Sequence, residues 1–108
     1  MTSNTNDGVK LQDDGETLRI LGVRELSATN ANSLRDLARA ALAETQRNIE
    51  IDLSLTAQVD SCGLGTLIAL HKTALARNGA LRLLNPTPSV QQILELTRMH
   101  RLFEIVEK

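Results

Sequence analysis

The side chains best placed to do chemistry lie in one short polar stretch, residues 59–65, which reads Val-Asp-Ser-Cys-Gly-Leu-Gly. Ser61 offers a hydroxyl, Cys62 a thiol and Asp60 a carboxylate. The side chains of Asp60 and Ser61 can each accept a hydrogen bond from the free N–H groups of a first helical turn, so either can cap a helix. A helix N-terminus also favours negative charge, so Ser61 there is either a simple cap or a hydroxyl suited to carry a phosphate.

A strand and a helix are predicted on the two sides of this stretch. Residues 49–54 alternate apolar and polar side chains, which is typical of a strand with one buried face, and we expect this strand to lead into the stretch. After it, four apolar side chains and one histidine recur every three or four residues, as on one face of a helix; they are Leu64, Leu67, Ile68, His71 and Leu75. Ser61 is therefore predicted to be exposed at the start of a helix.

Nucleophilic and nucleotide-binding chemistry fit the stretch poorly. His71 is the nearest base to Cys62, but nine helical residues separate them by about 14 Å, beyond hydrogen-bond reach. Gly63 and Gly65 begin a G-x-G pattern, but Ile68 stands where a dinucleotide fingerprint requires the next glycine. One Cys and two His make no recognisable metal cluster. We expect no enzymatic activity, no cofactor and no metal.

The amino-acid composition narrows the remaining classes of function. The chain has 108 residues, 42% of them hydrophobic and 23% charged, as expected for one folded domain. A net charge of −1 and a single aromatic residue, Phe103, argue against direct nucleic-acid binding. No apolar run is long enough for membrane insertion or a secretory signal, so the cytoplasm is the expected compartment. A monomer and a weak dimer both stay open.

The rest of the chain predicts an α/β domain over residues 9–108 after a disordered tail over residues 1–8. Residues 9–12 and 16–21 should form a hairpin around Asp13-Asp14-Gly15, and residues 80–84 a strand parallel to residues 49–54. A first helix should bury Leu34, Leu37, Ala38, Ala41 and Leu42, with Ser27, Thr29 and Asn30 as candidate caps. Thr87 and Pro88 should start a third helix.

Several of these segments together resemble a known family, the STAS domain (sulfate-transporter and anti-sigma-factor-antagonist domain). The resemblance covers residues 49–105 and its motifs occur in family order and at family spacing. They are Ile51-Asp52-Leu53-Ser54, residues 59–65, Leu83-Leu84-Asn85-Pro86, residues 90–97, and Leu102-Phe103-Glu104-Ile105.

The resemblance implies a single STAS domain, a mixed sheet with helices mainly on one side, that acts as an anti-sigma factor antagonist. In such proteins an anti-sigma factor that is a serine kinase phosphorylates the serine after the aspartate, and a phosphatase reverses this. By motif position that serine is Ser61. The partner-binding surface would comprise Asp60, Ser61, Cys62, Gly63, Leu64 and Gly65, with Thr66 or Lys72 as exposed contributors.

The chain departs from this pattern in one place. Antagonists commonly carry a Gly-x-x-Asp motif that brings an acid near the serine, whereas residues 22–25 read Gly-Val-Arg-Glu. Either Glu25 substitutes or the segment is shifted. The alternative functions are a STAS subunit of a lipid-transport ABC-type membrane complex, which would bind an ATPase, and a small enzyme using Cys62, which thiol alkylation would inactivate.

Overall fold

A five-stranded mixed sheet organises residues 8–107, which are the residues that the computed structural model describes. The predicted tail, residues 1–8, therefore lies outside the described residues except for Gly8. The sheet order is β1-β2-β4-β6-β7. Its strands are β1 (Lys10–Asp14), β2 (Thr17–Leu21), β4 (Asn48–Asp52), β6 (Leu81–Leu84) and β7 (Glu104–Val106).

The N-terminal hairpin forms as expected, but its turn lies further along the chain. β1 and β2 pair antiparallel and Asp14 is opposite Thr17, which leaves Gly15-Glu16 as a two-residue loop. Gly15 has φ +67°, a backbone conformation that glycine adopts without a steric penalty. The predicted turn at Asp13-Asp14-Gly15 was wrong in position: Asp13 and Asp14 are still paired in β1, and Gly15 takes the first loop position, as in a type II′ turn.

The remaining strands of this sheet run parallel to one another. β2 pairs with β4, β4 with β6, and β6 with β7, which confirms the predicted parallel pair. β4 ends at Asp52, so Leu53 lies just past the strand, although its N–H still donates to the carbonyl of Leu84. The branched and leucine side chains of these strands fill the inner face of the sheet.

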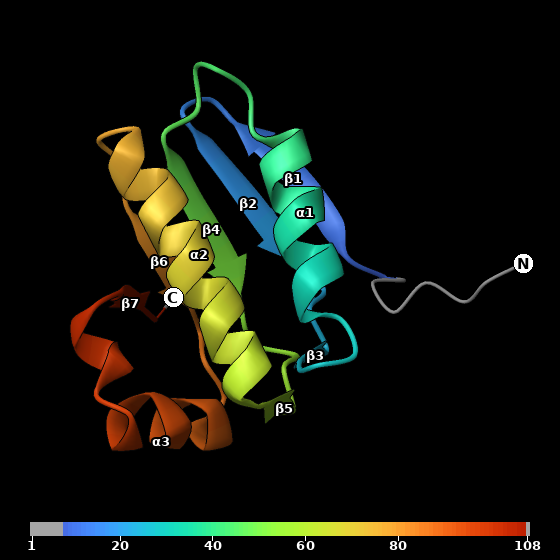
Figure 1. The fold of residues 1–108 in the computed structure, drawn as a ribbon, viewed down its shortest axis with the longest axis vertical. Helices are drawn as coiled ribbons and strands as arrows, with labels where there is room; N and C mark the ends of the chain where they lie inside the picture. Colours follow the sequence, from blue (N-terminus) through green and yellow to red (C-terminus); the bar gives the residue numbers. More distant parts are fainter. Residues whose placement is uncertain (1–7, 108) are drawn as a thin grey trace, which may run out of the picture.

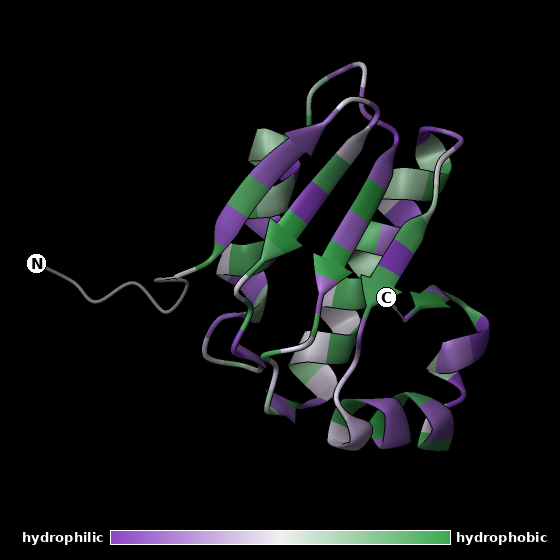
Figure 2. Cartoon of the chain, turned by 180° about the vertical axis from the view of Figure 1, so that it is seen from behind, coloured by the Kyte–Doolittle hydropathy of each residue, from purple (hydrophilic) through white to green (hydrophobic). Residues whose placement is uncertain are grey.

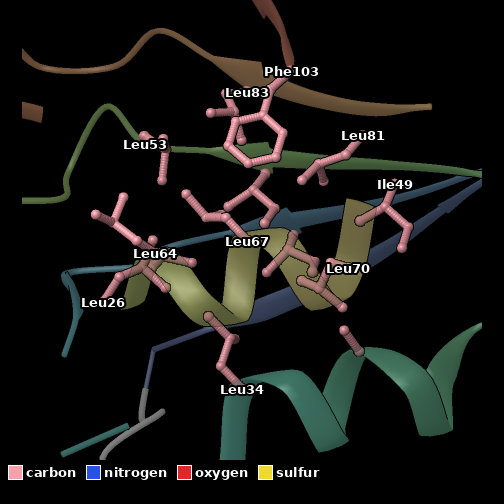
Figure 3. Packing of buried hydrophobic residues seen from close by; sticks show 14 of the residues in the cluster. Leu26, Leu34, Ile49, Leu53, Leu64, Leu67, Leu70, Leu81, Leu83 and Phe103 are labelled. Atoms are coloured by element: carbon pink, nitrogen blue, oxygen red, sulfur yellow. The ribbon is translucent and has the colours of Figure 1, made fainter. Parts of the chain in front are cut away.

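Two helices, α1 (Ala31–Ala41) and α2 (Ser61–Ala76), cover that inner face side by side (Figure 1). Leu67 and Leu70 of α2 are fully buried on the side of the sheet that carries Leu81 and Leu83, and the fully buried Leu34 of α1 faces α2 (Figure 3). The chain thus builds its core from aliphatic residues and Phe103. Leu37 was wrongly placed in this core: it is 37% exposed because α1 packs through Leu34 and Ala38.

A second, two-stranded sheet was not predicted. β3 (Glu25–Leu26) and β5 (Gln58–Val59) pair in parallel at the end of the molecule where α1 and α2 begin (Figure 1). β5, and not the strand over residues 49–54, leads into residues 59–65, because the chain turns between Leu53 and Thr56 after leaving the main sheet.

The C-terminal part completes the sheet edge. α3 (Pro88–Leu96) begins after Thr87 as predicted, but the Thr87 hydroxyl donates to the carbonyl of Thr56 and does not cap the helix. A short 3₁₀ helix, η1 (Met99–Arg101), follows Arg98, which has a left-handed backbone with φ 61°. β7 then adds to β6.

No described helix covers the outer face of the main sheet (Figure 2). Five residues in register form a row of polar side chains across it: Gln12, Arg19, Glu50, Arg82 and Glu104. Nε of Arg19 lies 2.8 Å from Glu50, and Nη1 of Arg82 lies 3.5 Å from the other Glu50 oxygen. We call this row the charge ladder; its two arginines balance the charges of its two glutamates.

Candidate functional site

Helix α2 begins at Ser61, as the sequence predicted. Asp60 precedes it in an extended conformation, and its carboxylate accepts a hydrogen bond of 3.0 Å from the N–H of Gly63. Asp60 is therefore the cap, and Ser61 is the first helical residue. Ser61 is exposed, and no hydrogen bond ties its hydroxyl to the rest of residues 8–107.

Asp60 also joins two segments that are far apart in the sequence. Its second carboxylate oxygen accepts from the N–H of Ala28 at 3.0 Å, while its own N–H donates to the carbonyl of Leu26. The hydrogen bonds from the Ala28 and Gly63 N–H groups lower the pKa of Asp60 below its usual value. The carboxylate is thus ionised at neutral pH and holds the β3–α1 loop beside the start of α2.

The β3–α1 loop, residues 27–30, lies beside this site and is held in place by side-chain hydrogen bonds. The buried Asn30 side chain accepts from the N–H of Ser27 at 3.0 Å and donates to the carbonyl of Glu25 at 2.7 Å. Ser27 and Asn30 were predicted as alternative helix caps; Asn30 does precede α1, but its side chain fixes the loop and not the helix. Sequence reasoning missed the part played by the Ala28 N–H, because a backbone donor leaves no trace in residue type.

Glu25 lies in this neighbourhood but is already engaged. It begins β3, which pairs with the strand leading to Asp60, and its carboxylate accepts a 2.9 Å hydrogen bond from the Ser27 hydroxyl. The Glu25 carboxylate is thus bound to Ser27, whereas Asp60 is the acid directly before Ser61 in the sequence. Whether Glu25 replaces the missing aspartate of the Gly-x-x-Asp motif stays a prediction.

The two glycines of the stretch have different environments. A Cβ on Gly63 would lie 2.0 Å from the carbonyl oxygen of Leu26, so Gly63 lets α2 approach β3. A Cβ on Gly65 would meet nothing within 4 Å. Gly65 lies in a regular helix, one turn after Ser61, and the packing of residues 8–107 does not explain why it is bare.

The other predicted surface residues divide between surface and core. Cys62 and Lys72 are exposed, whereas Leu64 is 8% exposed and packs beside Leu26 (Figure 3). Thr66 was wrongly expected to be exposed: it is 3% exposed, and its hydroxyl donates to the carbonyl of Ala31 at 2.8 Å. Of the predicted surface residues, Ser61, Cys62 and Gly65 are thus exposed at the start of α2, with Asp60 half-buried beside them, and Lys72 is exposed further along the helix.

The residues considered for nucleophilic catalysis or metal binding do not lie close together. His71 packs edge-on against the ring of Phe103 at 5.5 Å, within the core side of α2, while Cys62 is at the exposed start of that helix. Within residues 8–107, no three His, Cys, Asp or Glu side chains are grouped so that they could hold a metal ion. None of the described helices is both long and apolar enough to cross a membrane.

Comparison with known proteins agrees with this geometry. The STAS domain family model matches residues 12–108. The chain belongs to the STAS domain family. Its mixed sheet with three helices is the STAS arrangement, and the two features that define the site, an aspartate cap and an exposed serine at the start of α2, lie inside the matched region.

Solved structures share the fold of this STAS domain at low sequence identity. The anti-sigma factor antagonist SpoIIAA in its unphosphorylated form has a TM-score of 0.78 and 20% identity, covering 93% of this chain and 87% of that chain. SpoIIAA of Bacillus in its phosphorylated form has a TM-score of 0.71 at 20% identity, covering 93% and 90%. An anti-sigma factor antagonist from Mycobacterium paratuberculosis has a TM-score of 0.75 at 21% identity, covering 90% and 82%.

Proposed function

We propose that this STAS domain is an anti-sigma factor antagonist that binds a serine-kinase anti-sigma factor in the cytoplasm and is inactivated by phosphorylation of Ser61. The observation that carries the proposal is the exposed Ser61 hydroxyl at the first residue of α2, free of hydrogen bonds within residues 8–107. In the unphosphorylated state the domain binds the anti-sigma factor and so frees a sigma factor. A phosphatase restores that state. The domain itself has no catalytic role.

The binding surface in this proposal is the start of α2, residues 60–65. Ser61, Cys62 and Gly65 contact the partner directly, whereas Gly63 and Leu64 act from beneath by setting the height and angle of the helix against Leu26. Gly65 supports this arrangement. An unneeded glycine inside a helix costs about 1 kcal/mol relative to alanine, and close approach of a partner backbone would offset that cost.

Phosphorylation would change binding more than folding. A phosphoserine adds about 1.5 to 2 negative charges at pH 7. In the free domain water and the N-terminus of α2 accommodate that charge, although Asp60 is a nearby like charge. In the complex the phosphate would have to lose water against a surface that fits a neutral hydroxyl, at a cost of several kcal/mol unless it is paired.

Calorimetric titration against the cognate kinase tests the proposal. We expect Ser61→Ala to bind like the wild type and to resist phosphorylation, and Ser61→Asp to bind at least about tenfold more weakly with a near-native melting temperature. Equal affinities for the three forms would reject Ser61 as the switch. Co-purification with an ATPase of a transport complex, in place of a serine kinase, would favour the membrane-subunit function.

Gly65→Arg provides a second test of the same surface. The side chain would project from the exposed face of α2, where no atom lies within 4 Å of its Cβ apart from its chain neighbours and the adjacent helix backbone. Binding to the kinase should fall while the circular dichroism spectrum and melting temperature stay near native. A loss of fold that matches the loss of binding would show that Gly65 is structural and that the partner does not contact it.

A further inference from the structure

The free edge of the main sheet, strand β1, has features that a second copy of this chain would complement. β1 pairs with β2 on one side only, and within residues 8–107 no strand pairs with its other side. All five of its residues are exposed, including Leu11 at 37%. An edge strand of this kind presents unpaired backbone N–H and C=O groups that can pair with another strand.

The hairpin geometry decides which backbone groups face outward. In a hairpin with a two-residue loop, the pair that flanks the loop, here Asp14 and Thr17, is hydrogen-bonded, and bonded and non-bonded pairs then alternate along the strands. Lys10, Gln12 and Asp14 therefore direct their N–H and C=O groups to β2. Leu11 and Asp13 direct theirs to the free edge.

The sequence of β1 is complementary to itself about its centre. If two copies pair antiparallel around a two-fold axis through Gln12, Leu11 of each lies opposite Asp13 of the other, so that the outward N–H groups of each copy meet the outward carbonyls of the other. In the same register each Lys10 lies opposite the Asp14 of the second copy. Directly opposite charges of unlike sign stabilise a strand pair.

The complementarity is specific to that register. Moving one strand by two residues in one direction places Asp13 opposite Asp13, two like charges, and in the other direction it leaves Lys10 opposite the neutral Gln12. The charges thus oppose the first of these shifted pairings, and of the three registers only the one centred on Gln12 gains opposite-charge pairs within β1. Oδ2 of Asp14 already lies 3.0 Å from Nη2 of Arg19. The Asp14 side chain is nevertheless 59% exposed, so Lys10 of another copy can still reach its carboxylate.

We propose that two copies of this chain associate through their β1 strands, antiparallel and centred on Gln12, so that their main sheets join into one continuous sheet. The contact is small, a single five-residue strand from each copy, so the dimer is weak and forms at high protein concentration. α2 packs on β4 and β6, away from β1, which leaves the exposed serine of both copies accessible.

Charge-reversal variants of the full chain, studied by sedimentation equilibrium up to about 1 mM, test this pairing. Lys10→Asp alone and Asp14→Lys alone should each weaken self-association about tenfold or more, because each places like charges opposite one another in both pairs. Mixed at equal concentration, the two variants should form a heterodimer. One of its two charge pairs is then reversed in sign, and the other keeps the native Lys10 opposite the native Asp14.

Matched controls make the same charge changes elsewhere on the surface. Arg39→Asp and Glu44→Lys lie outside β1 and should dimerise like the wild type. Circular dichroism spectra of Lys10→Asp and Asp14→Lys identical to the wild type would establish that their losses do not come from unfolding.

Three outcomes would overturn the proposal. A wild-type chain that stays monomeric across the concentration range rules out the dimer. If either single variant self-associates like the wild type, or if the mixture forms no heterodimer, the copies do not pair through β1 in this register.

Discussion

Gly63 and Gly65 lie two residues apart in one helix, yet their substitution should have opposite effects on stability. Gly63→Ala places a Cβ 2.0 Å from the Leu26 carbonyl oxygen, so the backbone must shift and the free energy of unfolding should fall by about 1–3 kcal/mol or more. Gly65→Ala meets open space and should raise it by up to about 1 kcal/mol through higher helix propensity. Urea denaturation of the pair measures both; equal losses would mean that Gly65 also contacts the fold.

Asp60 gives the stability of the domain a defined pH dependence. Hydrogen bonds from Ala28 and Gly63 lower its pKa in the folded state below the ordinary value of 3.8. A lowered folded pKa means that the carboxylate stabilises the fold above pH 3.8, and that this contribution is lost as the pH falls through the folded value. The stability difference between the wild type and Asp60→Asn should therefore be largest near neutral pH and should shrink below pH 3.8.

Chemical denaturation of both proteins across the acid range measures this difference, and NMR titration of the Asp60 carboxyl measures the pKa directly. A difference that stays constant down to about pH 2 would show that the charge of Asp60 is irrelevant to its two hydrogen bonds. The Ser61→Ala variant is the matched control, because it alters the neighbouring residue without removing an acceptor of either N–H group.

At the level of single residues, the sequence predicted the cap and the exposed serine because both depend on local chemistry. Short polar side chains before a helical apolar pattern place a helix start within about one or two residues. Thr66 was misplaced because a polar residue type indicates the surface, whereas its hydroxyl is satisfied inside the protein by the carbonyl of Ala31. Periodicity says nothing about a hydrogen-bond partner 35 residues away.

Among the elements, the junction between α3 and η1 carries a testable strain. Arg98 has φ 61° there, a left-handed conformation that costs a non-glycine residue about 1–2 kcal/mol. Arg98→Gly should relieve that cost, although the greater freedom of glycine in the unfolded chain offsets part of it. The net gain in free energy of unfolding should be up to about 1 kcal/mol, measured by urea denaturation. Arg101→Gly, where the backbone lies in a 3₁₀ helix, should lose stability.

The sequence predicted the long elements well and the short ones poorly. β4, α2, β6 and the start of α3 each contain a repeating apolar pattern or a Pro signal, and each was found close to its predicted bounds. β3 and β5 have two residues each, too few to show an alternation, and they pair across more than 30 residues of sequence. The strand that leads into the site was therefore misassigned to residues 49–54.

Across the whole molecule, Glu50 connects the halves of the main sheet through the charge ladder. It is only 7% exposed and contacts both Arg19 and Arg82. Glu50→Gln should lower the free energy of unfolding by about 1.5–3 kcal/mol, because it removes the shielded charged acceptor that Arg19 and Arg82 share and leaves them only their exposed partners, Asp14 and Glu104. Glu104→Gln, at an exposed site, should cost less than about 1 kcal/mol.

Denaturation at low and at high salt distinguishes these two substitutions. Screening should diminish the effect of Glu104→Gln, whereas the effect of Glu50→Gln should persist because its side chain is largely shielded from solvent. If both substitutions cost the same and respond equally to salt, the ladder is an ordinary solvated surface with no stabilising centre.

The strand order also has a consequence for how the protein is made. In the main sheet β1, β2, β4, β6 and β7 are neighbours in the same order in which a ribosome synthesises them. Each new strand can therefore be added to the outer edge of the strands already present, and none has to be inserted between two earlier ones. The hairpin of β1 and β2 can form first from local contacts, and the growing sheet can then extend in one direction as the chain emerges.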